Sequence, residues 1–190
     1  MPPELIRATV CSANPHKLAE FRALFPGFEL ELLGELEFPP EDGATYRENA
    51  LIKARFGRRV GAAGRLMLAD DSGLEVAALG GAPGVMTARW ADDRHVEKIL
   101  DALAGSGDRS ARYVCELVAV SPEGTVRHGS GVLAGHIASA PAGAEGFGFD
   151  PVFVPLGEER TVAELGDAWK AVHSHRALAA RALVASLRRR

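Results

Sequence analysis

The sequence has little cysteine, no excess of positive charge and no long apolar segment. Cys11 and Cys115 are its two cysteines, and both lie in apolar, strand-like segments where a buried thiol is the usual state, so no disulfide framework is expected. The formal net charge of -3 leaves no general basic field for nucleic acid. The start, Met-Pro-Pro-Glu, lacks the features of a signal peptide, and no segment reaches the length of a membrane span. We therefore expect a cytoplasmic protein that binds neither nucleic acid nor membranes.

The sequence does have enough apolar residues for a core. Hydrophobic residues make up 47% of the chain and charged residues 25%, which is typical of a globular protein that folds without disulfides or a structural metal. Its 190 residues suit one domain, residues 1–190, with two lobes that share a sheet. Strands are predicted at residues 5–11, 28–33, 66–69, 111–120, 125–137 and 152–154, and helices at 15–25, 45–60, 92–104 and 175–187.

Two adjacent carboxylates, Asp70 and Asp71, follow the apolar run at residues 66–69. We expect the strand to end there, because Asp-Asp-Ser-Gly is typical of a turn. The backbone forces the two acids close together, so both stay ionised only with a cation, a lysine or water nearby. Mg²⁺ would meet this need, since it takes one or two carboxylates and completes its shell with water and phosphate oxygens. Taken alone, the pair favours a solvated turn.

The first predicted strand leads directly into a helix. Asn14 is a good N-cap and Pro15 a good first helical residue, which places Lys17 in the first turn. The free N–H groups and positive dipole end of such a helix bind phosphate well. The Gly-x4-Gly-Lys-Ser/Thr spacing of a P-loop is absent. A plain strand-to-helix turn with a surface lysine is the alternative.

The next helix is predicted from a capping box, Thr45 with Glu48 three residues on. Asn49 and Lys53 follow at i, i+4 spacing and form a polar stripe beside Glu48. The capping box alone explains Glu48, and a solvated charge is the alternative for Lys53.

Two glycine-rich loops come later in the chain. Gly80–Gly84 is a close turn, after which Arg89 could reach an anion. In residues 145–151, two glycines alternate with two phenylalanines before Asp150 and a proline. Glycine lets the backbone approach a ligand, an aromatic ring offers a stacking face, and a carboxylate or N–H group can bind the edge of a heterocycle. This pattern predicts a base pocket, with a tight turn and core phenylalanines as the alternative.

Six motifs occur in order along nearly the whole chain: Ser12-x-Asn-x-x-Lys17, Glu48-Asn-Ala-x-x-Lys53-Ala, Ala69-Asp-Asp-Ser-Gly-Leu74, Gly80-Gly-x-Pro-Gly84, Gly146-Phe-Gly-Phe-Asp-Pro151 and Ser174-His-Arg176. With them the chain resembles the inosine/xanthosine triphosphate pyrophosphatase family. The resemblance implies an α/β fold with an elongated mixed β-sheet flanked by helices and a substrate cleft between two lobes, usually as a homodimer. It also implies Mg²⁺-dependent hydrolysis of ITP, dITP and XTP to the monophosphate and pyrophosphate, which removes deaminated purines from the nucleotide pool.

The resemblance also implies roles for single residues. Asp71 would be the general base and a magnesium ligand, and Ser72 would contact the substrate. The triphosphate would be bound by Ser12, Ala13, Asn14, Pro15, His16, Lys17 and Lys53, with Arg89 facing phosphate. The base pocket would be formed by Phe147, Gly148, Phe149, Asp150, Lys170, His175 and Arg176.

Two departures from the family pattern affect these expectations. The family's first motif usually reads Thr-Gly-Asn, whereas this chain has Ser12-Ala-Asn14, so the turn differs in backbone shape. A loop acid before the capped helix usually ligates magnesium, and Glu41 is the candidate, with Pro40 and Asp42 beside it leaving the register open.

Two other functions compete with this one. A nucleotide-binding sensor would keep the fold without turnover, but the Asp70–Asp71 pair and Lys53 favour an enzyme. A related pyrophosphatase could act on another nucleotide such as dTTP, but the pocket at residues 147–150 favours a purine.

Overall fold

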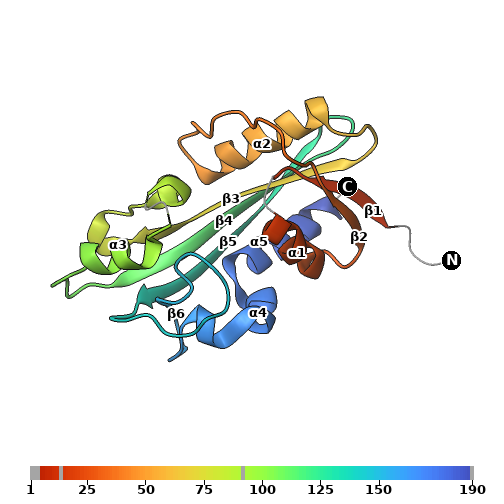
Figure 1. The fold of residues 1–190 in the computed structure, drawn as a ribbon. Helices are drawn as coiled ribbons and strands as arrows, with labels where there is room; N and C mark the ends of the chain where they lie inside the picture. Colours follow the sequence, from red (N-terminus) through yellow and green to blue (C-terminus); the bar gives the residue numbers. More distant parts are fainter. Residues whose placement is uncertain (1–4, 13–14, 91–92, 189–190) are drawn as a thin grey trace. The chain divides into compact units, whose positions relative to one another are not determined.

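The computed structural model describes residues 5–12, 15–90 and 93–188, and Figure 1 shows its strands and helices in chain order. The strands are β1 (Ile6–Val10), β2 (Phe28–Leu32), β3 (Leu66–Val76), β4 (Ser110–Val120), β5 (Val126–Ile137) and β6 (Phe153–Pro155). The helices are α1 (Pro15–Leu24), α2 (Tyr46–Val60), α3 (His95–Ala102), α4 (Val162–His173) and α5 (His175–Leu187), with short 3-10 helices η1 (Ala77–Leu79) and η2 (Gly84–Arg89). Within these described ranges, no helix combines the length and apolar character needed to span a membrane.

The strands form one six-stranded sheet in the order β2-β1-β3-β4-β5-β6. β1 runs parallel to both β2 and β3, whereas β5 and β6 are antiparallel. Between β4 and β5 the chain turns at Ser121–Gly124, where the Ser121 N–H donates to the Thr125 carbonyl oxygen at 2.9 Å. The prediction of a mixed sheet flanked by helices is confirmed. The two strand-like runs joined by Pro122-Glu-Gly124 also predict a β-hairpin, which the neighbouring strands β4 and β5 confirm.

The chain divides into two compact units. The first holds the described residues of Met1–Asp71, Glu116–Ser130 and Leu178–Arg190, and the second holds Ser72–Cys115 and Gly131–Ala177. The first border falls between Asp71 and Ser72, two consecutive residues of β3. Apart from Arg89, the described residues predicted for the triphosphate belong to the first unit, and those predicted for the base pocket belong to the second. Each group is described within its own unit.

The first unit packs the apolar face of α2 against the sheet. Ala50 and Ala54 of α2 contact a buried cluster with Met67 and Ala69 of β3 and with Cys11. The predicted capping box is present, because the Thr45 side chain accepts from the Glu48 N–H at 3.2 Å and the Glu48 carboxylate accepts from the Thr45 N–H at 3.0 Å. Both cysteines are buried free thiols, and burial raises the pKa of Cys11 to about 12. The thiol is therefore a small core group.

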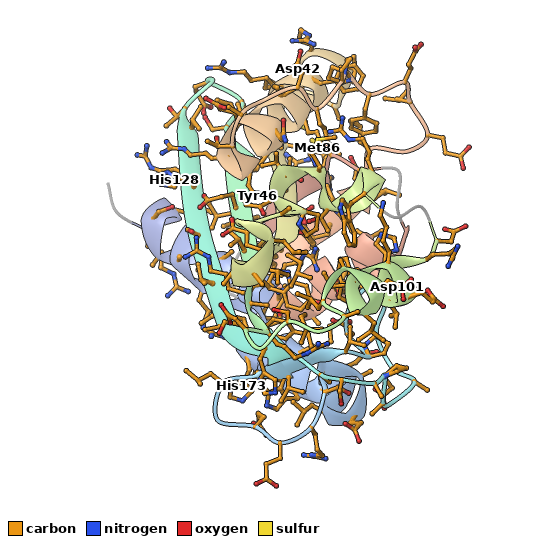
Figure 2. All side chains as sticks on the ribbon, turned by 90° about the vertical axis from the view of Figure 1, so that its left-hand side faces the viewer. Asp42, Tyr46, Met86, Asp101, His128 and His173 are labelled. Carbon is orange, nitrogen blue, oxygen red and sulfur yellow. The ribbon has the colours of Figure 1, made fainter. Side chains whose placement is uncertain are left out.

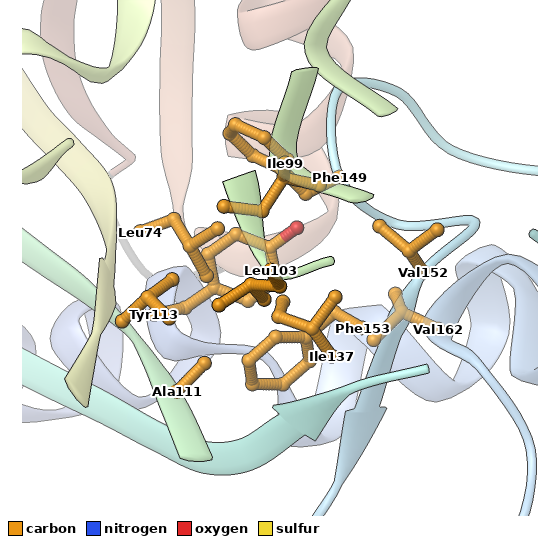
Figure 3. Packing of buried hydrophobic residues seen from close by; sticks show 11 residues of the cluster. Leu74, Ile99, Leu103, Ala111, Tyr113, Ile137, Phe149, Val152, Phe153 and Val162 are labelled. Atoms are coloured by element: carbon orange, nitrogen blue, oxygen red, sulfur yellow. The ribbon is translucent and has the colours of Figure 1, made fainter. Parts of the chain in front are cut away.

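The core of the second unit is shown from close by in Figure 3. Leu74 from β3, Ile99 from α3, Leu103 directly after α3 and Phe153 from β6 are fully buried in it. Tyr113 of β4 joins the same cluster, with its ring centre 4.4 Å from that of Phe153. This core holds the ends of β3, β4 and β5 that belong to the second unit together with α3.

Two expectations about the elements are wrong. β3 does not end at Ala69 but continues through both carboxylates to Val76, because lysines and an amide compensate the acids within the strand. The prediction missed α4, although Thr161 and Glu164 form a capping box there. Gly166, with a φ of 81°, interrupts its helical pattern.

One boundary also differs. The structure starts α3 at His95, three residues after the predicted start, which lies outside the described residues. The helical spacing of residues 175–187 also predicts Ala182 on the buried side of α5, but Ala182 is exposed, and Ala179, Ala180 and Leu183 are buried.

The contact of β5 with α5 depends on a glycine. A Cβ atom at Gly129 would lie 2.3 Å from the Ala179 carbonyl oxygen and 2.3 Å from the Leu183 nitrogen. Backbone atoms cannot rotate away, so we expect Gly129→Ala to lower the free energy of unfolding by about 2 to 3 kcal/mol. Urea denaturation measures this. Gly107→Ala is the matched control, because no heavy atom lies within 4 Å of its Cβ position. Equal stability of the two variants would contradict the proposed packing.

Candidate active site

The adjacent acids Asp70 and Asp71 point to opposite faces of β3. Successive side chains alternate along a strand, so Asp71 shares the face of Met67 and Ala69, which pack on α2. Asp70 takes the other face, where Lys17 of α1 reaches it at 2.8 Å. Figure 1 shows α2 above β3 and α1 below it. Each carboxylate thus meets a lysine from a different helix.

Asp71 is held by two side chains of α2. The Asn49 amide donates to Asp71 Oδ2 at 3.0 Å, and Lys53 Nζ lies 3.8 Å from Asp71 Oδ1. Lys53 also bonds Glu41 at 3.0 Å, so one ammonium group serves two carboxylates. The side-chain oxygen Oδ1 of Asn49 accepts from the Gly43 N–H at 2.8 Å. This bond connects the loop that carries Glu41 to the same helix.

Burial makes these charges sensitive to their surroundings. Removal of water raises the pKa of Asp71 above its ordinary value, while Lys53 and the Asn49 amide oppose the rise and Glu41 and Asp70 add to it. Burial alone would lower the pKa of Lys53, but the neighbouring carboxylates raise it instead. Asp71 is therefore a more basic carboxylate than one in water, and Lys53 keeps its proton.

The donor set around Lys53 suits a divalent cation. Glu41 and Asp71 already share one positive charge, and both offer the hard oxygen ligands that Mg²⁺ prefers. No group of three or more acidic, histidine or cysteine residues able to hold a metal occurs within the described ranges. The set therefore fits an ion that takes two protein carboxylates and fills its other positions with water and phosphate oxygens.

The second unit contains a hollow of about 520 Å³, part of it open to solvent. Ser72, which was expected to contact the substrate, lines it together with the seven residues predicted for the base pocket: Phe147, Gly148, Phe149, Asp150, Lys170, His175 and Arg176. Phe147 exposes 54% of its surface, whereas Phe149 is buried in the core of the unit. Only the first ring is free to stack on a ligand.

Asp150 is the centre of this pocket's polar network. Its Oδ2 accepts from Lys170 Nζ at 2.8 Å and from the Phe147 N–H at 3.0 Å, and its Oδ1 accepts from the Tyr113 hydroxyl at 3.3 Å. Lys170 Nζ also lies 4.6 Å from the centre of the Phe147 ring. The carboxylate therefore fixes both the lysine and the aromatic loop.

Residues from the start of α5 complete the pocket. The ring of His175 stacks on Tyr113 with centres 4.7 Å apart and an angle of 16°. Arg176 donates to Ser72 Oγ at 3.2 Å. The motif Ser174-His-Arg176 thus connects the start of α5 to β3.

Other predicted residues fall outside these two clusters. Ala13 and Asn14 lie outside the described residues, as do the side chains of Pro15 and His16 at the start of α1. Ser12 is half-buried directly after β1. Arg89 is exposed at the end of η2 and is not among the residues that line the hollow. Lys17 lies beside Asp70, one of the two adjacent acids.

Two residues of the site were missed as functional groups. Asn49 was noted only as part of a polar stripe, and its spacing with Lys53 was the available signal. Tyr113 lies in an apolar strand segment, and no local pattern distinguishes it from a core residue.

The fold and these clusters define a class of α/β protein with a buried carboxylate-lysine site and a separate aromatic pocket. The chain belongs to the Ham1 family, whose model matches residues 8–186. This confirms the resemblance to a family of triphosphate pyrophosphatases, and so to enzymes, that the motifs predicted.

Relatives of known structure or name agree with this assignment. A dITP/XTP pyrophosphatase of Ralstonia nicotianae is 44% identical, over 96% of each chain. The Ham1 protein of Staphylococcus aureus has a similar structure, with a TM-score of 0.83, 34% identity and coverage of 95% of this chain and 97% of that one. A nucleoside-triphosphatase / dITP/XTP pyrophosphatase of Mycobacterium abscessus gives a TM-score of 0.73 with 42% identity, covering 95% and 97%.

The raised pKa of Asp71 predicts a pH dependence of stability. Between the ordinary aspartate value of about 4 and the raised value, the folded state binds more protons than the unfolded state, so stability falls as pH rises. In magnesium-free buffer, wild type should lose stability relative to Asp71→Asn as pH rises through this window. Urea unfolding of both proteins at several pH values measures the difference. A rise in the stability of wild type relative to Asp71→Asn over the same pH range would contradict the raised pKa of Asp71.

Proposed function

We propose that this protein is a Mg²⁺-dependent nucleoside-triphosphate pyrophosphatase that converts ITP, dITP and XTP to the monophosphate and pyrophosphate. The observation that carries the proposal is the buried Asp71, fixed by Asn49 and Lys53 next to Glu41. The names of the relatives support the substrate class. The family resemblance further supports a cytoplasmic homodimer that uses the whole chain as one domain.

In this proposal Asp71 is the general base. Its carboxylate accepts a proton from water, whose oxygen forms a bond to the α-phosphorus while the bond to the α–β bridging oxygen breaks. Pyrophosphate leaves with the electron pair of that bond. Because such transfer depends mainly on positioning and charge neutralisation, Lys53 and Lys17 contribute by stabilising the phosphates. Glu41 and Asp71 would hold Mg²⁺, which when bound neutralises phosphate charge.

The second unit would bind the purine. The exposed ring of Phe147 offers a stacking surface, and Lys170 beside it is a donor for the 6-oxo group of hypoxanthine or xanthine. Adenine has an amino group at this position and would leave the donor without an acceptor, which weakens binding. Lys170, which the Asp150 carboxylate holds in place, and Arg176 therefore provide donors that favour 6-oxo purines.

Replacement of the proposed base tests the mechanism. We expect Asp71→Asn to lower kcat for ITP by about 100-fold or more, because the amide cannot accept the proton of the attacking water. Initial rates at saturating Mg²⁺ measure this, and circular dichroism checks the fold. Asp101→Asn, at an exposed position of α3 (Figure 2), is the control that should keep the wild-type rate. Hydrolysis of ITP by Asp71→Asn at the parent rate would refute the assignment.

A substrate panel tests the function itself. Wild-type protein is incubated with ITP, dITP, XTP, ATP, GTP and dTTP, and pyrophosphate is converted to phosphate and quantified. The proposal requires that ITP, dITP and XTP react fastest. Binding of these nucleotides without turnover would indicate a sensor, and preferred turnover of dTTP would indicate a different pyrophosphatase.

Substitution of two neighbouring loop acids, Glu41 and Asp42, tests which of them is the second magnesium ligand. Glu41 contacts Lys53, whereas Asp42 is exposed in the same loop (Figure 2). We expect Glu41→Gln to raise the Mg²⁺ concentration for half-maximal rate by at least about tenfold, and Asp42→Asn to leave it unchanged. Rates measured over a Mg²⁺ series decide this. The reverse result would move the second ligand to Asp42.

A further inference from the structure

The pocket of the second unit contains an acceptor that its own donors already occupy. Asp150 is the single carboxylate among the described residues that line the hollow. Lys170 and the Phe147 N–H bond one of its oxygens, and Tyr113 bonds the other. Asp150 is only 5% exposed. A ligand in this pocket therefore meets a carboxylate whose two oxygens both have protein partners.

The Tyr113 hydroxyl stays protonated and so remains a hydrogen-bond donor to that carboxylate. Burial and the nearby Asp150 charge raise the pKa of Tyr113 well above its ordinary value, so the hydroxyl keeps its proton and donates it to Oδ1. The ring is fixed by stacking on His175 and by packing on Phe153. Both Tyr113 and Asp150 line the hollow, so the hydroxyl covers Oδ1 at the wall of the pocket.

The partly occupied carboxylate affects a difference between substrates that a donor for the 6-oxo group cannot detect. Guanine and hypoxanthine share the 6-oxo group and the N1–H, and they differ by the 2-amino group of guanine. A free carboxylate would accept from N1–H and the 2-amino group together. The Tyr113 hydroxyl takes one of the two lone pairs of Oδ1, so this oxygen is a weaker acceptor for a buried amino group, which weakens binding. Xanthine carries an oxo group at this position and needs a donor instead.

Resting on the proposed function, we propose that Tyr113 is a specificity-determining residue, whose hydroxyl occupies Asp150 Oδ1 and thereby excludes 2-aminopurine nucleotides such as GTP. The hydroxyl acts through Asp150 and need not touch the base. Loss of the hydroxyl frees an acceptor at the pocket wall, so discrimination against guanine should weaken while the recognition of the 6-oxo group by Lys170 remains.

The test compares kcat/KM for ITP, XTP, GTP and dGTP in wild type and Tyr113→Phe. The phenylalanine keeps the ring stacking and removes only the hydroxyl. We expect wild type to hydrolyse GTP at least about tenfold less efficiently than ITP. In Tyr113→Phe, the GTP to ITP ratio should rise about three- to tenfold, mainly through a lower KM for GTP, with kcat for ITP retained. A purely structural role would change all four substrates by one factor.

Tyr46→Phe is the matched control, since Tyr46 is the other tyrosine of the chain and lies at the start of α2 in the first unit (Figure 2). It should leave the GTP to ITP ratio unchanged. An unchanged or lower ratio in Tyr113→Phe, or equal use of GTP and ITP by wild type, would overturn the role of Tyr113 while the pyrophosphatase activity stands. Absence of hydrolysis of every nucleotide by wild type would instead refute the proposed function. Competition by GMP and IMP measures the same ratio for binding alone.

Discussion

The structure of the first unit depends on compensating two consecutive carboxylates inside a buried strand. Asp70 and Asp71 are almost completely buried, and an unpaired buried charge would cost several kcal/mol. The strand solves this by directing them to opposite faces, where α1 supplies Lys17 and α2 supplies Asn49 and Lys53. The connections from β1 to α1 and from the Glu41 loop to α2 are therefore constrained by charge as well as by packing.

Asp70 and Asp71 differ in their surroundings because their partners differ. Asp70 has a close ion pair with Lys17 at 2.8 Å, whereas Asp71 has an amide partner and a more distant ammonium group at 3.8 Å. Lys53 is closer to Glu41, at 3.0 Å. Burial raises the pKa of Asp71, and a basic carboxylate is what a base for water and a ligand for a cation both require.

The second unit uses a buried carboxylate in another way. Asp150 binds Lys170, the Phe147 N–H and Tyr113 at once, so it organises the pocket rather than reacting. Its geometry holds a lysine next to an exposed aromatic ring. In the proposed function, Asp71 is the base for the chemistry, and Asp150 holds the groups that would recognise the purine.

Local patterns in the sequence predicted the elements whose cause is local. The Thr45 and Glu48 capping box placed the start of α2, and the turn after Ser121 placed the hairpin. The end of β3 was wrong because Asp-Asp-Ser-Gly favours a turn until distant lysines compensate the charge. Tyr113 could not be recognised, because its hydroxyl gains a role only when Asp150, 37 residues away, lies opposite. The motif resemblance supplied roles that no local pattern contained.

We propose that Asp71 and Glu41, on the α2 side of β3, form the reactive metal site. A crystal structure of the protein with Mg²⁺ and a non-hydrolysable α,β-imido analogue of ITP is the direct test. We expect an ion with Asp71 and Glu41 oxygens at about 2.1 Å and with water and phosphate oxygens in its remaining positions. An ion bound instead by Asp70 on the face of α1, with Asp71 still bonded only to Asn49 and Lys53, would contradict it.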